Sequence, residues 1–288
     1  MSVVGSGEYI YERIDEWAHL PTGLSMGQAA GVVVDGQGRV FVAHRGNPPI
    51  LIFDQEGALI GAWGSDLIHE AHQVALDGQD VVLVTDRAAH AVVAFSDAGE
   101  PLWHLGTPGI PSATGCAEDA GPVPQPAGPF NRPTKAVRSP TGDLFASDGY
   151  RNCRVHRFAP DGTLLTSWGV FGKISPGAFH LPHSVAVDRH GRVYVCDREN
   201  SRIQIFSADG AFLQEWTDLY RPTDVYMASD GVIYVSELFP RVTVLALDGA
   251  VLSRWEAPPS SHGIALDDSG NIYIAQVRGQ RVTKYRRV

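Results

Sequence analysis

Apolar residues in this chain form short runs separated by polar turns, and one such arrangement occurs six times. Each copy has an apolar run, a turn rich in Asp and Gly, and a second run rich in Val, Tyr and Phe, which is the pattern of a β-hairpin. The copies align without a gap and cover residues 30–44, 72–86, 134–148, 183–197, 223–237 and 262–276. This spacing of roughly 40 residues indicates a repeat protein with one sheet per copy.

A third and a fourth strand are expected after each hairpin, as in the segments 201–210 and 211–216. The tryptophans share one repeat position, near the end of the fourth strand or of the early segment 11–17. A large ring at this position can seal the seam between neighbouring sheets. These residues are Trp17, Trp63, Trp103, Trp168, Trp216 and Trp255.

The two ends of the chain are expected to complete one sheet together. The last repeat stops before a fourth strand, whereas the segment 11–17 has no hairpin before it. Pairing of these ends would hide the edge strands of a radial array. The sequence therefore predicts an all-β, six-bladed β-propeller in a single domain, 1–288, with blades at about 28–64, 70–104, 132–169, 181–217, 221–256 and 260–288, the last completed by 8–18.

Composition agrees with a folded protein and argues against two classes of partner. Apolar residues make up 44% of the chain and charged residues 19%, as in globular proteins with a sizeable core. The net charge is −9 and the 23 basic residues are scattered, so no Lys/Arg run is present that could neutralise nucleic acid or an anionic membrane. We expect a monomer that acts on a small molecule or a peptide.

The start of the chain and the cysteines bear on the cellular compartment. No basic stretch followed by an apolar one opens the chain, and no run long enough to span a membrane occurs, so we expect neither export nor membrane insertion. Cys116, Cys153 and Cys196 include no Cys-x-x-Cys pair, which argues against a disulfide framework and a thiolate metal site. A cytoplasmic location is the resulting expectation.

Histidine recurs at the residue that opens the first strand of every second repeat. The aligned residues are Ala30, His72, Thr134, His183, Thr223 and His262. In a six-bladed propeller, alternate blades would place three imidazoles around the axis at mutual angles near ~120°. A single histidine in a strand is usually a packed core residue, but three in one register point to a metal site with an open position. Zinc is the default ion, although imidazole also suits iron, copper and nickel.

Arginines and a tyrosine are candidates for the mouth of the predicted channel. Arg45, Arg87 and Arg198 share the position after the second strand, where an arginine can bind a carboxylate through two hydrogen bonds. The alternative is an ion pair with a nearby acid, which we favour for Arg87. Tyr150 follows one residue later in its repeat; it is either a half-buried packing residue or, beside a cation, a base.

Two connections are longer than the others, at 106–133 and 169–182, and both are rich in Gly and Pro. Long loops in a compact domain are often functional lids or rims. A loose surface insertion is the alternative for the first loop. The sequence leaves both interpretations open.

The chain resembles the peptidyl-α-hydroxyglycine α-amidating lyase family, whose catalytic domain is built of NHL-type repeats. The resemblance rests on "HRG", "HQVALD", "RPTKAVRSPTGDLFASDGYRNCRV", "LPHSVAVDRHGRVYVCDRENSRIQIF" and "SSHGIALDDSGNIYIAQ". It implies that His72, His183 and His262 bind zinc and that Tyr150 is the base. It also gives Arg45 and Arg198 counterparts at the substrate site.

The chain departs from the family pattern at three positions. The family has an aspartate after the third histidine, which helps to hold a structural calcium ion, whereas this chain has Gly263. Asn131 and Arg151 replace the cysteine pair around the tyrosine, which suits an intracellular protein. A structural calcium ion therefore lacks one expected ligand.

The reaction implied by the resemblance splits a carbinolamide, a peptidyl- or acyl-α-hydroxyglycine, into an amide and glyoxylate. Two alternatives remain open at the level of sequence. One keeps the metal and the tyrosine but acts on another small hydroxylated or lactone-like compound, because one scaffold can host several chemistries. The other is a non-catalytic NHL propeller that binds a protein or RNA.

Overall fold

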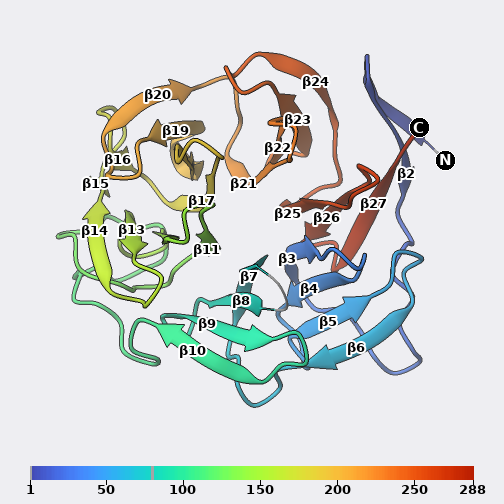
Figure 1. The fold of residues 1–288 in the computed structure, drawn as a ribbon, viewed down its shortest axis with the longest axis horizontal. Helices are drawn as coiled ribbons and strands as arrows, with labels where there is room; N and C mark the ends of the chain where they lie inside the picture. Colours follow the sequence, from blue (N-terminus) through green and yellow to red (C-terminus); the bar gives the residue numbers. More distant parts are fainter. Residues whose placement is uncertain (1, 79–80) are drawn as a thin grey trace. The chain divides into compact units, whose positions relative to one another are not determined.

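The chain is almost entirely β-structure in the computed structural model, which describes residues 2–78 and 81–288 (Figure 1). Within these residues the strands form six sheets of four or five strands and one two-stranded sheet, the six-blade arrangement of a β-propeller. The predicted fold class is confirmed. The turn of the second predicted hairpin includes residues 79 and 80, which lie outside the described residues.

Three sheets contain the strands between residues 29 and 168. The first consists of β3 (Ala29–Val34), β4 (Val40–His44), β5 (Ile50–Phe53) and β6 (Leu59–Trp63). The second consists of β7 (Ala71–Leu76), β8 (Val81–Asp86), β9 (Ala91–Ser96) and β10 (Pro101–Leu105). The third consists of β11 (Lys135–Arg138), β12 (Leu144–Asp148), β13 (Arg154–Phe158) and β14 (Leu164–Trp168).

The remaining sheets follow the same plan. The fourth has β17 (Pro182–Val187), β18 (Val193–Asp197), β19 (Arg202–Phe206) and β20 (Phe212–Trp216), with the 3-10 helix η1 (Arg198–Asn200) between β18 and β19. The fifth has β21 (Pro222–Met227), β22 (Ile233–Glu237), β23 (Arg241–Leu245) and β24 (Val251–Glu256). The short sheet in the second long loop pairs β15 (Val170–Phe171) with β16 (Ala178–Phe179).

The last sheet joins the two ends of the chain. It contains β25 (Ser261–Leu266), β26 (Ile272–Gln276), β27 (Arg281–Arg287), β2 (Tyr9–Ile14) and β1 (Ser2–Ser6). β2 pairs antiparallel with β27, with Ile14 opposite Lys284, and both strands are seen beside the marked termini in Figure 1. The strand expected from the segment 8–18 is therefore present, while β1 is an addition that the repeat pattern did not predict.

The strands group into two compact units, Met1–Val74 with Tyr226–Val288 and Ala75–Val225. In the first unit, the Trp17 ring lies 5.4 Å from Phe53 of β5 and 5.0 Å from Tyr273 of β26. In the second unit, Trp168 of β14 lies 5.8 Å from Phe206 of β19. These rings contact two sheets each, so the predicted role of the tryptophans at sheet seams is confirmed for them.

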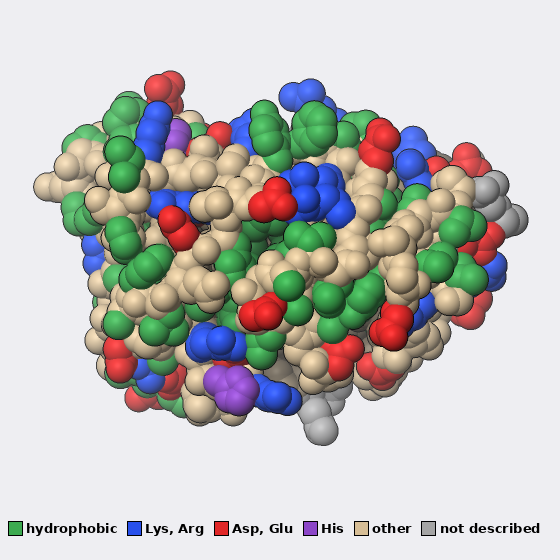
Figure 2. Space-filling view, turned by 90° about the horizontal axis from the view of Figure 1, so that it is seen from above, with side chains coloured by type: hydrophobic (Ala, Val, Ile, Leu, Met, Phe, Trp, Pro, Cys, Tyr) green, Lys and Arg blue, Asp and Glu red, His purple; other side chains and the backbone are tan. Residues whose placement is uncertain are grey.

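Charged side chains are distributed without a long block of one sign. Figure 2 shows acidic and basic side chains interspersed on the face that it draws. No helix in the described part of the chain combines the length and the hydropathy needed to cross a membrane. The scattered charges agree with the pattern seen in the sequence.

Candidate metal centre

His72 and His262 open the first strands of their sheets, and both side chains are buried. Their ring centroids are 4.9 Å apart with an angle of 72° between the ring planes. Edge-to-face contact at this distance is also found between packed aromatic rings. The pair alone therefore shows that the sequence register brings two imidazoles together inside the first unit.

The orientation of two histidines is set by backbone carbonyl groups. His262 Nδ1 lies 2.7 Å from the carbonyl oxygen of Ala30, and His183 Nδ1 lies 2.6 Å from that of Thr223. A carbonyl oxygen can only accept, so in each ring Nδ1–H is the donor and Nε2 carries the lone pair. Metal-binding histidines commonly donate their second ring nitrogen in this way.

The partners of these two hydrogen bonds show a regularity that the sequence analysis missed. Ala30 and Thr223 occupy the same aligned position as the histidines, one repeat further along the series. Each of these two rings therefore donates to the entrance residue of another repeat. The aligned column contained a signal for these hydrogen bonds, since its histidines alternate with Ala or Thr. Such small residues leave their carbonyl groups accessible to a histidine ring of another repeat.

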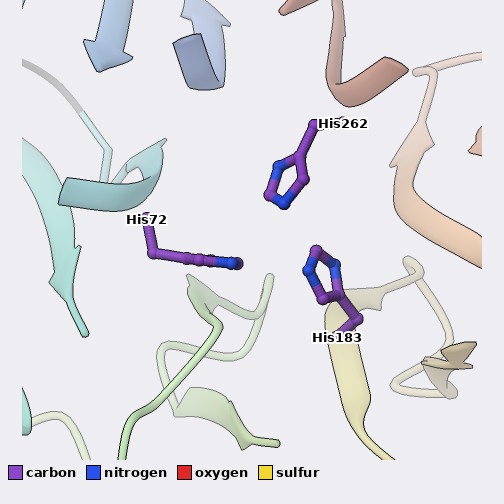
Figure 3. Close-up of side chains that lie close together, drawn as sticks. All are labelled: His72, His183 and His262. Atoms are coloured by element: carbon purple, nitrogen blue, oxygen red, sulfur yellow. The ribbon is translucent and has the colours of Figure 1, made fainter. Parts of the chain in front are cut away.

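The predicted set of three histidines is brought together. The ligand nitrogens of His72, His183 and His262 lie within 4.8 Å of one another and could hold a metal ion, and Figure 3 shows the three rings pointing toward one another. Three imidazoles, two of them oriented by carbonyl acceptors, are a donor set that suits a divalent transition metal. The residues present thus fit a metal, whose identity they leave open.

Tyr150 lies beside one of these histidines in the second unit. It lies two residues after the end of β12, its side chain is only 7% exposed, and its hydroxyl oxygen is 3.5 Å from His183 Nε2. The guanidinium groups of Arg87 and Arg198 lie over its ring, 4.5 Å and 5.9 Å from the centroid. A phenol that contacts both a ligand histidine and cations is in position for proton transfer.

The predicted arginines all have carboxylate neighbours. Arg45 lies 3.4 Å from Glu70, and its NH1 donates to Gln28 Oε1 at 2.7 Å. Arg198 lies 2.8 Å from Glu199, the next residue. Arg87 lies 3.6 Å from Asp119 in the first long loop, so the ion pair favoured for this residue is present.

Charges determine the ionisation of Glu199 beside Arg198. Burial by itself would raise the pKa of this carboxyl group, but hydrogen bonds from Arg221 and Arg198 and their charges outweigh it. The pKa of Glu199 therefore lies below its usual value, and the group is a carboxylate at neutral pH. Arg198 is consequently held in a permanent ion pair with its neighbour.

A buried ion pair adjoins the histidine column. The residues that follow the aligned entrance positions are Gly31, Gln73, Lys135, Ser184, Asp224 and Gly263. Lys135 Nζ donates to Asp224 Oδ1 at 2.6 Å, and Ser184 Oγ donates to the same oxygen at 2.6 Å. The sequence analysis did not single out this pair, although a lysine and an aspartate, the two charged residues of one aligned column, could have indicated it.

Gly263 has no room for the aspartate found in the family pattern. A Cβ atom built on it would lie 2.9 Å from the carbonyl oxygen of Ala30 and 3.1 Å from Val32 N. These are backbone atoms of β3, which cannot rotate away as a side chain can. A carboxylate at this position would therefore require β3 to move, which agrees with the expectation that this calcium ligand is missing.

Comparisons with known proteins identify the class first. The family model described as NHL repeat matches residues 179–206. Among solved structures, the chain is similar to a streptogramin B lyase (TM-score 0.64, 13% identity, 96% of this chain and 97% of that one). It is also similar to a putative gluconolactonase (TM-score 0.67, 16% identity, 92% and 93%). The protein is thus a six-bladed propeller of NHL type, and these structures show the fold alone.

Sequence relatives narrow the resemblance. NHL repeat-containing protein 3 from Homo sapiens is 29% identical over 96% of this chain and 85% of its own. Peptidyl-glycine alpha-amidating monooxygenase from Mus musculus is 30% identical over 71% of this chain and 23% of its own. Peptidyl-alpha-hydroxyglycine alpha-amidating lyase 1 from Drosophila melanogaster is 31% identical over 54% and 28%. The chain resembles the amidating-lyase family, as its motifs indicated.

Proposed function

We propose that this protein is a metal-dependent lyase that cleaves a peptidyl- or acyl-α-hydroxyglycine to an amide and glyoxylate. The observation that carries the proposal is the set of three histidines whose ligand nitrogens lie within 4.8 Å of one another, with Tyr150 beside His183. Relatives named amidating lyase, at 26–31% identity, support a lyase. Zinc is the proposed ion, bound by Nε2 of His183 and His262 and by His72.

The proposed reaction needs a base at the substrate hydroxyl. When bound, a zinc or similar divalent ion would supply a Lewis acid at the hydroxyl oxygen. Tyr150 Oη, as the phenolate, accepts the hydroxyl proton, and the electron pair of the O–H bond forms the C=O bond of glyoxylate. The electron pair of the C–N bond goes to the amide nitrogen, which takes up the proton that Tyr150 received. No water molecule and no redox partner are consumed.

Arg45 is the proposed binding group for the substrate carboxylate. Gln28 holds one of its nitrogens at 2.7 Å, and Glu70 neutralises part of its charge. The fixed plane of the guanidinium favours a carboxylate that approaches with both oxygens. Arg198, which is paired with Glu199, would add positive charge on the side of Tyr150 and help to keep the C–N bond aligned.

Elemental mass spectrometry of the purified protein is the first test. We expect about one divalent metal ion per chain, its loss in His183→Ala, and its retention in His190→Ala, because His190 is an exposed residue of the turn in the same sheet. The metal-loaded protein should then release glyoxylate from an N-acyl-α-hydroxyglycine. A protein that stays metal-free when supplied with zinc, iron, copper or nickel would contradict the proposal.

A non-catalytic protein-binding propeller is the second candidate. The match to NHL repeat-containing protein 3, whose name states no lyase activity, covers more of both chains than the lyase matches do, and it leaves this candidate open. A metal-free protein without lyase activity would support this candidate. A metal-loaded protein that is inactive on α-hydroxyglycines but hydrolyses a lactone would support a related metal-dependent hydrolase.

The expectations of a monomeric, cytoplasmic protein with a small-molecule or peptide substrate, and without nucleic-acid or membrane partners, stay part of the proposal. The expected absence of nucleic-acid and membrane partners rests on the net charge of −9 and on the scattered basic residues, and the cytoplasmic location on cysteines that form no Cys-x-x-Cys pair. Size-exclusion chromatography with light scattering and cell fractionation test them directly.

A further inference from the structure

The first long loop, residues 106–133, is packed within the second unit, to which it belongs. Asn131 N donates to both carboxylate oxygens of Asp148 at 3.0 Å, and Asn131 Nδ2 donates to Thr114 Oγ1 at 2.9 Å. The Phe130 side chain is fully buried. These contacts anchor the base of the loop in the core and argue against a loose insertion.

The tip of the loop is attached by a different kind of contact. The Asp119 carboxylate lies 2.7 Å from Arg132, 2.7 Å from Arg151 and 3.6 Å from Arg87. The next residue, Ala120, donates its N–H to the carbonyl oxygen of Tyr150 at 2.9 Å. One half-exposed carboxylate thus joins three arginines from separate parts of the chain next to Tyr150.

The same arginine that reaches Asp119 also covers the Tyr150 ring. The guanidinium of Arg87 is 4.5 Å from the ring centroid, a distance at which a cation is attracted to the aromatic face. Three guanidinium groups around one point repel each other unless an anion lies between them. Asp119 is the anion that lies there, so its charge favours the position of Arg87 over Tyr150 and the attachment of the loop tip.

We propose that Asp119 is a positioning residue for Tyr150: its carboxylate holds Arg87 over the phenol ring and fastens the loop tip, residues 118–121, beside it. Asp119 acts through Arg87 and the loop and does not touch the substrate. The role of Tyr150 in turnover rests on the proposed lyase function, whereas the fastening of the loop does not.

The test compares Asp119→Asn, Asp119→Glu and the control Asp209→Asn. Asp209 is an exposed acid that pairs with Arg157 in another part of the second unit, so the control removes an ion pair of the same type. In the metal-loaded protein we expect Asp119→Asn to lower kcat about tenfold, as misplacement of a reacting group does, with KM nearly unchanged. Asp119→Glu should restore most of the rate, and Asp209→Asn should leave it unchanged.

Two readouts do not depend on turnover. Hydrogen exchange of residues 116–121 should become faster in Asp119→Asn and not in the control. Nitration of Tyr150, 7% exposed, should increase relative to Tyr220, 52% exposed, as followed by peptide mass spectrometry. Metal content should be the same in all variants.

The outcomes separate the two proposals. Faster exchange and nitration with an unchanged kcat in an active enzyme would overturn the positioning role, and unchanged exchange and nitration would overturn the fastening by Asp119. If the wild-type protein has no lyase activity, the proposed function fails, but the exchange and nitration results still decide whether Asp119 holds the loop at Tyr150.

Discussion

The surroundings of His183 and the tip of the first long loop both contact Tyr150 and are held in different ways. His183 is fully buried and donates Nδ1–H to the Thr223 carbonyl oxygen at 2.6 Å. Asp119 has a side chain that is 30% exposed and is held by ion pairs with arginines. The candidate metal ligand is thus fixed by the backbone, and the proposed base is flanked by a contact that water can reach.

This difference has physical consequences. A strand carbonyl has no rotamers and keeps its direction as long as the sheet is folded, so the ring that donates to it is preorganised. Surface ion pairs contribute little to stability and are screened by salt. Changes in salt or surface charge that leave the fold intact should therefore affect the loop tip first. Changes around His183 should instead alter the stability of the fold or the affinity for a metal.

The largest effect is expected for Tyr150→Phe. Removal of the hydroxyl group should lower kcat for glyoxylate release by about 10²–10⁴-fold, the usual contribution of general acid–base catalysis. Metal content should not change, because the hydroxyl group contacts His183 at 3.5 Å without being part of the three-histidine set. Steady-state kinetics and elemental analysis of the same preparation measure both quantities. A variant with normal kcat would remove Tyr150 from the reaction.

The second largest effect is expected from the buried ion pair of Lys135 with Asp224. Lys135→Met should lower the free energy of unfolding by roughly 3–5 kcal/mol, because it leaves the Asp224 carboxylate buried without its cation. The double variant Lys135→Met/Asp224→Asn should recover much of this loss, since no uncompensated charge remains. Urea unfolding followed by tryptophan fluorescence measures both variants. Equal losses in the single and the double variant would mean that charge compensation is not what the pair provides.

A smaller effect on the free energy of unfolding is expected from Cys153, which packs in one core cluster with Val123 of the first long loop. Burial raises the pKa of the Cys153 thiol from 9.0 to about 12, and Asp197 and Asp148 add to the shift. The folded state therefore favours the thiol, so this contribution to stability is complete below pH 9 and is lost as the pH rises from 9 to 12. At pH 10 the loss should be roughly 1 kcal/mol.

Urea unfolding at pH 8 and pH 10 tests this prediction, with Cys153→Ala as the control. The decrease in stability between the two pH values should be smaller in the variant by the stated amount, because other groups titrate equally in both proteins. The same decrease in both proteins would show that water reaches the thiol, and hence that the base of the loop is packed less tightly than described.

The smallest effect is expected from salt. Raising sodium chloride from 0.1 M to 1 M shortens the screening length from about 10 Å to 3 Å and should weaken the contacts of Asp119. We expect roughly a twofold decrease in kcat and faster hydrogen exchange at residues 116–121, with unchanged metal content. In Asp119→Asn the salt dependence should disappear. A loss of metal at high salt would contradict the expectation that the surroundings of His183 depend less on salt than the loop tip does.

The sequence predicted what depends on local periodicity. The hairpins follow from alternating apolar runs, and His72, His183 and His262 followed from their register, because aligned positions of a repeat occupy equivalent places in the fold. Contacts between residues distant in sequence could not be predicted in this way. Lys135 and Asp224 pair across 89 residues, and no local pattern marks either as the partner of the other.

The contacts of Asp119 in the first long loop could not be predicted for the same reason. The Gly and Pro content of the loop indicated a connection, but a single aspartate in such a segment has no periodic partner, and the arginines around Asp119 come from residues 87, 132 and 151. The Arg45–Glu70 contact was missed for a similar reason. Sequence register locates equivalent positions, whereas ion pairs in irregular segments depend on the folded path of the loop.

Gly263 of β25 lets the backbone of β3 come close enough to accept a hydrogen bond from the ring of His262. The hydrogen bond from His262 Nδ1 to Ala30 exists because a glycine lets β3 approach to a distance at which a Cβ atom would contact that same carbonyl oxygen. Any side chain at residue 263 would have to displace the acceptor that fixes which ring nitrogen carries the proton. Residue 263 therefore tolerates few substitutions, and an engineer who introduced a carboxylate there to add a cation site would disturb the tautomer of a candidate metal ligand.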